Sequence, residues 1–196
     1  MANFKGPRFK LSRRLGLNVY GHPKAMNRVS KGTSRADKKL SEYGQQLLEK
    51  QRLRAYYGVM EKQFAKYVSV AKKSKEQTGH ALVQILESRL DNLVYRLGIA
   101  SSIRQARQMV VHGHILVDNK KVDIPSYLVQ PGNNISLKEK SKSIELFKAN
   151  FENAFLSTFP YIAKNKNTFG GEFLRLPQRD EVPIEIEDQL VVEYYS

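Results

Sequence analysis

The sequence predicts an α+β protein in which a mostly helical N-terminal domain is followed by two helices and a small antiparallel sheet. Two patterns support this prediction. Apolar residues recur at helical intervals from Ser41 to Leu97, and from His114 to Glu139 they alternate as in short strands separated by turns. Because 41% of the 196 residues are hydrophobic, the chain can bury a core.

The charge of the chain is strongly positive and unevenly distributed. The net charge is +14 with a pI near 9.9, which favours a polyanionic partner such as nucleic acid or an acidic membrane surface. Residues 1–54 carry a net +11, residues 55–171 a net +8, and residues 172–196 a net −5. No run of 18 apolar residues and no cysteine occurs, so the sequence predicts no transmembrane helix, disulfide or thiolate zinc site.

The first part of the chain predicts a basic arm and three helices. Residues 1–40 mix Gly, Pro, Ser and basic residues without periodicity, which favours an extended, irregular arm. Helices are expected from Ser41 to Gly58, over residues 60–75, and from His80 to Leu97. The polar side of the first helix carries cations that we expect to point outward: Lys50, Arg52 and Arg54.

A fourth helix is predicted to begin at a capping box of Ser102 and Gln105 and to end at Gly113. Its polar face, its C-terminal corner and the tip of the following hairpin offer groups that bind phosphate or reach bases and sugar hydroxyls. These groups belong to Arg104, Arg107, Gln108, His112, His114, Lys120 and Lys121. A helix face that is merely solvated is the alternative that this pattern leaves open.

The remaining elements are short. Residues 114–124 alternate around Asp118 and Asn119, which tolerate the positive φ of a hairpin turn. A further strand is expected at residues 133–139, and a fifth helix at residues 142–156 with a stripe of core phenylalanines. We expect the closing segment, QLVVEYYS, to be strand-like.

The residues of the fourth helix and hairpin belong to a longer recognisable span. ESRLDNLVYRLGIASSIRQARQMVVHGHILVDNKKVDIPSYLVQPGNNISLKEK resembles the S-four RNA-binding module. Three further blocks, FKGPRFKLSRRLGL, LSEYGQQLLEKQRLRAYYGVMEKQFAKY and FLRLPQRDEVPIEIEDQLVVEYYS, are similar to the small-subunit ribosomal protein S-four family. The resemblance predicts four parts: an RNA-binding arm (1–40), a helical domain (41–86), the module (87–141), and a helix and tail that pack back on the protein (142–196).

The resemblance implies a function and partners. Family members bind 16S-type ribosomal RNA at a helix junction of the 5′ domain, nucleate assembly of the small subunit, and affect decoding accuracy where messenger RNA enters, beside ribosomal proteins S-three and S-five. The resemblance implies that the chain has no enzyme activity, cofactor, metal, small-molecule substrate or membrane contact. It also implies a location on ribosomes, either in the bacterial cytoplasm or in an organelle that encodes the chain. The predicted RNA-binding residues are Lys5, Arg8, Lys10, Arg13, Arg14, Lys50, Arg52, Arg54, Arg104, Arg107, Gln108, His112, His114, Lys120 and Lys121.

Two departures from the family pattern concern the arm. Many relatives bind zinc there through four cysteines, which this chain lacks, so RNA contacts and local packing are expected to order the arm. The family also commonly has a Pro-Gly-His-Gly type turn where this chain has VSKGTSR, which leaves the conformation of residues 29–36 open.

Two other functions compete with the ribosomal one. Arg89, Leu90 and Asp91 resemble the catalytic triplet of pseudouridine synthases, but no separate catalytic domain follows, and an aspartate within a helix also pairs with nearby arginines. A stand-alone factor could use the same module on stalled ribosomes or transfer RNA. Such factors are usually shorter and need neither the basic arm nor the QLVVEYYS ending.

Overall fold

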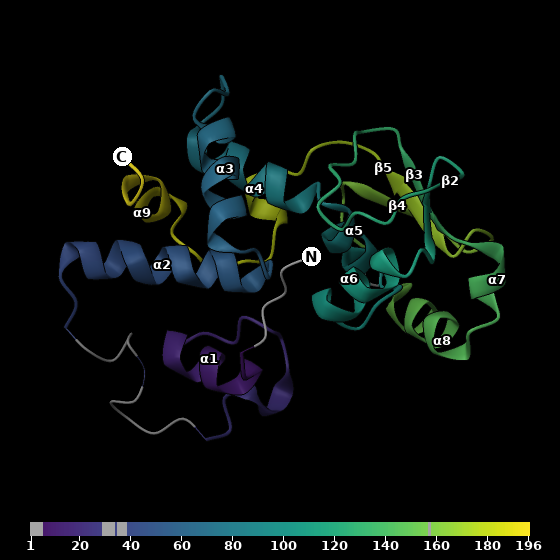
Figure 1. The fold of residues 1–196 in the computed structure, drawn as a ribbon, viewed down its shortest axis with the longest axis horizontal. Helices are drawn as coiled ribbons and strands as arrows, with labels where there is room; N and C mark the ends of the chain where they lie inside the picture. Colours follow the sequence, from purple (N-terminus) through teal and green to yellow (C-terminus); the bar gives the residue numbers. More distant parts are fainter. Residues whose placement is uncertain (1–5, 29–33, 35–38, 157) are drawn as a thin grey trace. The chain divides into compact units, whose positions relative to one another are not determined.

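A computed structural model describes residues 6–28, 34, 39–156 and 158–196 (Figure 1). The chain forms two compact units, one made of Met1–Leu82 with Ile184–Ser196 and the other of Val83–Pro183. Helices and an antiparallel sheet are both present, which confirms the α+β prediction. The predicted RNA-binding residue Lys5 lies outside the described residues. So does the segment 29–36, whose conformation the sequence left open, except for Ser34. Among the described helices, none has the length and apolar character needed to cross a membrane.

The arm is not wholly irregular, which corrects the prediction. Helix α1 (Arg8–Leu15) and the short 3-10 helix η1 (Pro23–Ala25) lie within it. Helix α1 ends at Gly16, whose φ of 65° closes a left-handed cap. Leu15 and Val19 then bury against Leu48 and Ala55, and this small core packs the arm against the first long helix of the chain.

The other helices of the first unit are α2 (Glu42–Tyr56), α3 (Glu61–Ala71) and α9 (Asp188–Glu193). Helices α2 and α3 were predicted, and the Ser41 Oγ caps α2 by accepting the Gly44 N–H at 3.3 Å. The predicted strand-like ending is wrong because the segment forms α9. It does pack back on the protein, against α2, with Val191 buried. Tertiary packing thus overrides the strand propensity of its valines and tyrosines.

The single helix predicted from His80 to Leu97 is two helices, α4 (Thr78–Glu87) and α5 (Leu90–Arg96). Between them the backbone of Arg89 is extended and forms a bridge with Leu128. Hydrogen bonds from Leu90 N to Tyr127 O and from Val129 N to Ser88 O, both 2.9 Å, hold the break. The loop that contains Tyr127 and Val129, far along the chain, therefore supplies the backbone partners that interrupt the helix.

The second unit contains a five-stranded antiparallel sheet in the order β2-β1-β3-β5-β4. The strands are β1 (Ile115–Val117), β2 (Lys120–Lys121), β3 (Asn134–Leu137), β4 (Ile162–Asn165) and β5 (Gly170–Phe173). The predicted hairpin is confirmed, with φ of 47° at Asp118 and 63° at Asn119. Strands β4 and β5 were not predicted. At Gly170 a Cβ would lie 1.9 Å from the Ile135 carbonyl oxygen, so close strand packing requires glycine where a strand pattern would show an apolar residue.

Helix α6 (Ile103–Val111) packs its apolar face against α5 and the sheet, together with α8 (Glu145–Ala154), which follows the one-turn α7 (Glu139–Lys142). The Ser102 Oγ caps α6 by accepting the Gln105 N–H at 3.3 Å. The capping box does not close as predicted, because the Gln105 side chain accepts from Ser101 instead. Phe147 and Phe151 are buried in this core, as the phenylalanine stripe predicted.

Candidate nucleic-acid interface

Helix α1 carries four of the predicted RNA-binding cations. Arg8, Lys10 and Arg14 are exposed and Arg13 is half-buried. Within the described part of the chain none of these four forms an ion pair, although the Arg8 guanidinium lies 5.8 Å from the centre of the Phe9 ring. Arg13 and Arg14 also lie in the last turn, where the helix dipole favours positive charge. Helix α1 therefore offers several cations to an external anion.

The cations of α2 do not point outward as predicted. The Lys50 side chain is only 4% exposed, and its Nζ lies 3.0 Å from the Glu61 carboxylate. Arg54 donates to the same carboxylate at 3.1 Å. Arg52 donates to the Leu15 carbonyl at 2.9 Å and so ties α2 to α1. These three side chains are part of the packing within the first unit, and their predicted contact with RNA stays a prediction.

Glu61 is the centre of that packing. Its carboxylate accepts from Lys50 and Arg54 and, at 2.6 Å, from the Tyr195 hydroxyl of the C-terminal segment. Burial acts to raise the pKa of Glu61, but the Tyr195 and Lys50 hydrogen bonds and the charges of Lys50 and Arg54 outweigh it, and the pKa lies below its usual value. Burial and the nearby carboxylate together raise the pKa of Tyr195.

The Tyr195 hydroxyl should make stability depend on alkaline pH. Because its pKa is raised in the folded chain, its contribution is complete below the ordinary tyrosine pKa of 10.0 and is lost as the pH rises above that value. We expect Tyr195→Phe to reduce the drop in the free energy of unfolding between pH 8 and pH 11, measured by urea titration. The exposed Tyr127→Phe is the control and should keep the wild-type drop. Equal drops in all three proteins would contradict this assignment.

In the second unit, Arg107 on α6 is held by a buried carboxylate. Its Nε and Nη2 donate to one Asp91 oxygen at 3.1 and 2.8 Å, and Arg89 donates to both oxygens of the same group. Asp91 is fully buried, so two guanidinium groups compensate its charge. The arrangement fixes the direction of the Arg107 fork, which has five N–H donors in all.

The other predicted residues of α6 and the hairpin are mostly accessible. Gln108, His112, Lys120 and Lys121 are exposed, and Arg104 is half-buried. The Lys121 side chain also covers the turn at Gly113, where a Cβ would lie 2.4 Å from the lysine Cε. The hairpin therefore lies against the C-terminal end of α6 at Lys121, and the contact of these residues with RNA stays a prediction.

His114 differs from this accessible group. Its ring is half-buried, its Nδ1 is 2.9 Å from the Ser141 hydroxyl, and it packs edge-to-face with the Phe147 ring at a centroid distance of 5.3 Å. Burial, with the nearby charges of His112 and Lys138, lowers the pKa of His114. The structure therefore gives His114 a packing role, and its contact with RNA stays a prediction.

Lys24, Arg28 and Lys164 are among the cations that the sequence-based set did not include. Lys24 and Arg28 follow α1, and their signal was available, because residues 6–28 contain six Lys or Arg and no Asp or Glu. Lys164 on β4 had no such signal, because the strand that carries it was not predicted. Across the described residues, no three His, Asp or Glu side chains are grouped as ligands of a metal ion would be.

Comparison with known proteins accounts for the whole chain. A family model described as the ribosomal protein S4/S9 N-terminal domain matches residues 3–87, and the S4 domain matches residues 88–135. The chain is 63% identical to the small ribosomal subunit protein uS4 of Finegoldia magna, and the alignment covers both proteins over their full length. It is 57% identical to the uS4B protein of Clostridium acetobutylicum, of which it covers 99%.

The chain belongs to the uS4 family of small-subunit ribosomal proteins. The resemblance that the sequence predicted is therefore confirmed. As a uS4-family member it has an S4 domain whose matched span ends at residue 135, within β3, and residues 162–173 add two further strands to that sheet.

Membership of the uS4 family also bears on the competing functions. The relatives are named as components of the ribosome, and these names state no enzyme activity. Asp91, the residue that resembles a pseudouridine synthase nucleophile, lies fully buried between Arg89 and Arg107. The structure thus supports the alternative that the sequence left open, an aspartate paired with arginines.

Proposed function

We propose that this uS4-family chain is a structural component of the small ribosomal subunit that binds the ribosomal RNA directly. The α1 surface carries the proposal: four cations on two turns of helix, without an ion pair among the described residues, beside a stretch that contains no acid. Such a surface neutralises phosphates and releases their counterions. The cations of α2 differ from those of α1, because carboxylates within the protein already compensate the α2 charges.

The second unit supplies a different kind of contact. Arg107 and Arg89 share the single Asp91 carboxylate, so this cluster keeps one net positive charge, with the Arg107 side chain 11% exposed. The exposed Gln108 lies on α6 and the exposed His112 caps its C-terminal end. Fixed donors on a rigid helix suit a folded RNA with a defined contour better than a flexible single strand. Phosphate contacts by Lys120 and Lys121 at the hairpin tip complete this part of the proposal.

The family supports a more specific role. By that analogy the chain binds the helix junction of the 5′ domain of the small-subunit RNA, nucleates assembly, and contributes to decoding accuracy beside ribosomal proteins S-five and S-three, where messenger RNA enters. Each of the two units carries predicted RNA-binding residues of its own, so the chain can contact two RNA segments, which supports a role in nucleating assembly. The proposed location is the ribosome in the bacterial cytoplasm, or in an organelle that encodes the chain.

Sedimentation tests the structural role. Small subunits from cells that express the chain at its natural level are washed at increasing salt and pelleted. We expect the chain to remain in the pellet in stoichiometric amount after a wash that strips loosely bound factors, because many phosphate contacts act together within an assembled particle. Release into the supernatant with transfer RNA would favour the stand-alone factor and contradict the proposal.

A further inference from the structure

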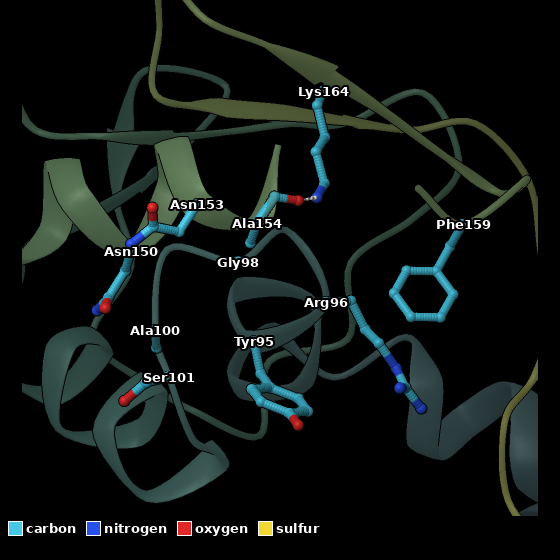
Figure 2. Close-up of a pocket in the computed structure, with 10 residues that line it drawn as sticks. All are labelled: Tyr95, Arg96, Gly98, Ala100, Ser101, Asn150, Asn153, Ala154, Phe159 and Lys164. Carbon is cyan, nitrogen blue, oxygen red and sulfur yellow. Dashed lines mark hydrogen bonds between the residues drawn. The ribbon is translucent and has the colours of Figure 1, made fainter. Parts of the chain in front are cut away.

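The second unit has a pocket of about 380 Å³ that the proposed RNA contacts do not use (Figure 2). It lies between the end of α5, the turn that precedes α6, helix α8 and strand β4, and ten residues line it. Neither Asp nor Glu is among the ten, whereas Arg96 and Lys164 are. The volume lies within the range of sites that bind small organic groups.

Two half-buried aromatic rings, those of Tyr95 and Phe159, contribute to the lining. The Arg96 guanidinium lies 4.9 Å from the centre of the Phe159 ring while it is bonded to the buried Glu87 carboxylate. The bond to Glu87 holds the Arg96 guanidinium in place, and the guanidinium in turn restricts the orientation of the Phe159 ring. A fixed aromatic face is a platform on which an unpaired base stacks.

The polar part of the lining comes from α8 and β4. Asn150 donates to the Ile99 carbonyl at 3.4 Å, and Asn153 lies exposed at the rim. Side-chain amides carry a donor and an acceptor side by side, the pattern that pairs with base edges. Lys164 reaches from its strand toward the α8 terminus and donates to the Ala154 carbonyl, as Figure 2 shows. Burial lowers the pKa of Lys164, and a phosphate beside it would raise that pKa again.

We propose that this pocket receives one unpaired nucleotide of the RNA that the protein binds, with its base at the rings and amides and its phosphate at Lys164. The inference rests on the proposed RNA binding and adds a site to it. The lining supports it in three ways: aromatic faces for stacking, two amides for hydrogen bonding, and the ammonium group of Lys164. The charge of Arg96 is compensated by Glu87 and serves to fix the ring.

A mononucleotide tests the pocket without ribosomal RNA. The full chain is titrated with adenosine 5′-monophosphate while its backbone amide signals are followed by NMR. We expect signals of Gly98, Ser101 and Asn153 to shift, and inorganic phosphate at the same concentration not to reproduce these shifts. Asn153→Trp, which fills the rim, should weaken binding at least about tenfold. Asn167→Trp makes the same replacement in the exposed β4–β5 turn and should bind as wild type.

The same pair of variants tests the pocket with RNA. Against the folded 5′ region of small-subunit RNA, Asn153→Trp should lose affinity about tenfold, as for one stacked base. The slope of log K against log salt should become less steep by at most about 1, because only the single phosphate contact at Lys164 is lost with the base. Asn167→Trp should keep wild-type affinity. Equal RNA affinity in both variants, or pocket signals that inorganic phosphate shifts equally, would overturn the pocket proposal. Failure of the wild-type chain to bind the RNA would instead overturn the proposed function.

Discussion

Replacing Glu87 by leucine should lower the free energy of unfolding of the second unit by about 3–5 kcal/mol. The Glu87 side chain is fully buried, and its carboxylate accepts two hydrogen bonds from Arg96, at 3.0 and 2.6 Å. The Tyr161 hydroxyl at 2.9 Å and the Asn92 amide at 2.8 Å also donate to it. Leucine would remove the carboxylate that compensates the buried Arg96 charge, and the Tyr161 hydroxyl and the Asn92 amide would each lose one hydrogen bond, which adds to the cost.

Two controls separate the loss of charge compensation from loss of packing. The double variant Glu87→Leu with Arg96→Met removes both charges, so it should recover much of the lost stability. Glu139→Leu breaks the ion pair with Lys142 at a glutamate that is 84% exposed, and it should cost less than about 1 kcal/mol. The measurement is urea unfolding followed by circular dichroism. A cost for Glu87→Leu no larger than that for Glu139→Leu would show that the buried network contributes little.

Neutralising the four cations of α1 should have the largest effect on RNA binding. We expect a chain with Arg8, Lys10, Arg13 and Arg14 all replaced by glutamine to bind the folded 5′ region of small-subunit RNA roughly 10²–10³-fold more weakly at 0.1 M salt. The slope of log K against log salt should become less steep by about 3, because about four phosphate contacts are lost. The helix itself should persist, since glutamine has good helix propensity and Leu15 still packs in the core.

The matched control for this variant is Arg52→Gln on α2. Arg52 binds the Leu15 carbonyl and the Glu49 carboxylate, so its loss should reduce stability. It should leave the salt slope of RNA binding close to that of wild type, because the structure places this cation in internal contacts. A slope that falls for Arg52→Gln and stays constant for the α1 variant would reverse the assignment of the two helices.

The predictable parts of the fold are those whose cause is local. Helices α2, α3 and α6 follow from apolar periodicity and from caps such as Ser41 and Ser102, and the hairpin follows from Asp118 and Asn119. The unpredicted parts depend on partners far away in the sequence. The break before α5 needs the backbone of residues 127–129, and β5 needs glycines that let it approach β3.

The candidate interface divides in the same way. Sequence alone placed Gln108, Lys120 and Lys121 on an accessible surface, because helical phase and turn chemistry decide their direction. The prediction that Lys50 points outward was wrong. Its ammonium pairs with Glu61 on the next helix, and a tyrosine ring of the C-terminal segment lies 4.2 Å from it. Whether a cation is free for RNA is a property of tertiary contacts, which residue type and periodicity do not encode.

The central claim is that fixed cations on this fold recognise the shape of structured ribosomal RNA. The most direct test compares the affinity of the full chain for the folded 5′ domain of small-subunit RNA with its affinity for a shuffled RNA of equal length and composition, from 50 to 200 mM salt. We predict a preference for the folded RNA of at least about 100-fold, which persists while both affinities fall steeply with salt. Equal affinity for the two RNAs at every salt concentration would contradict the claim.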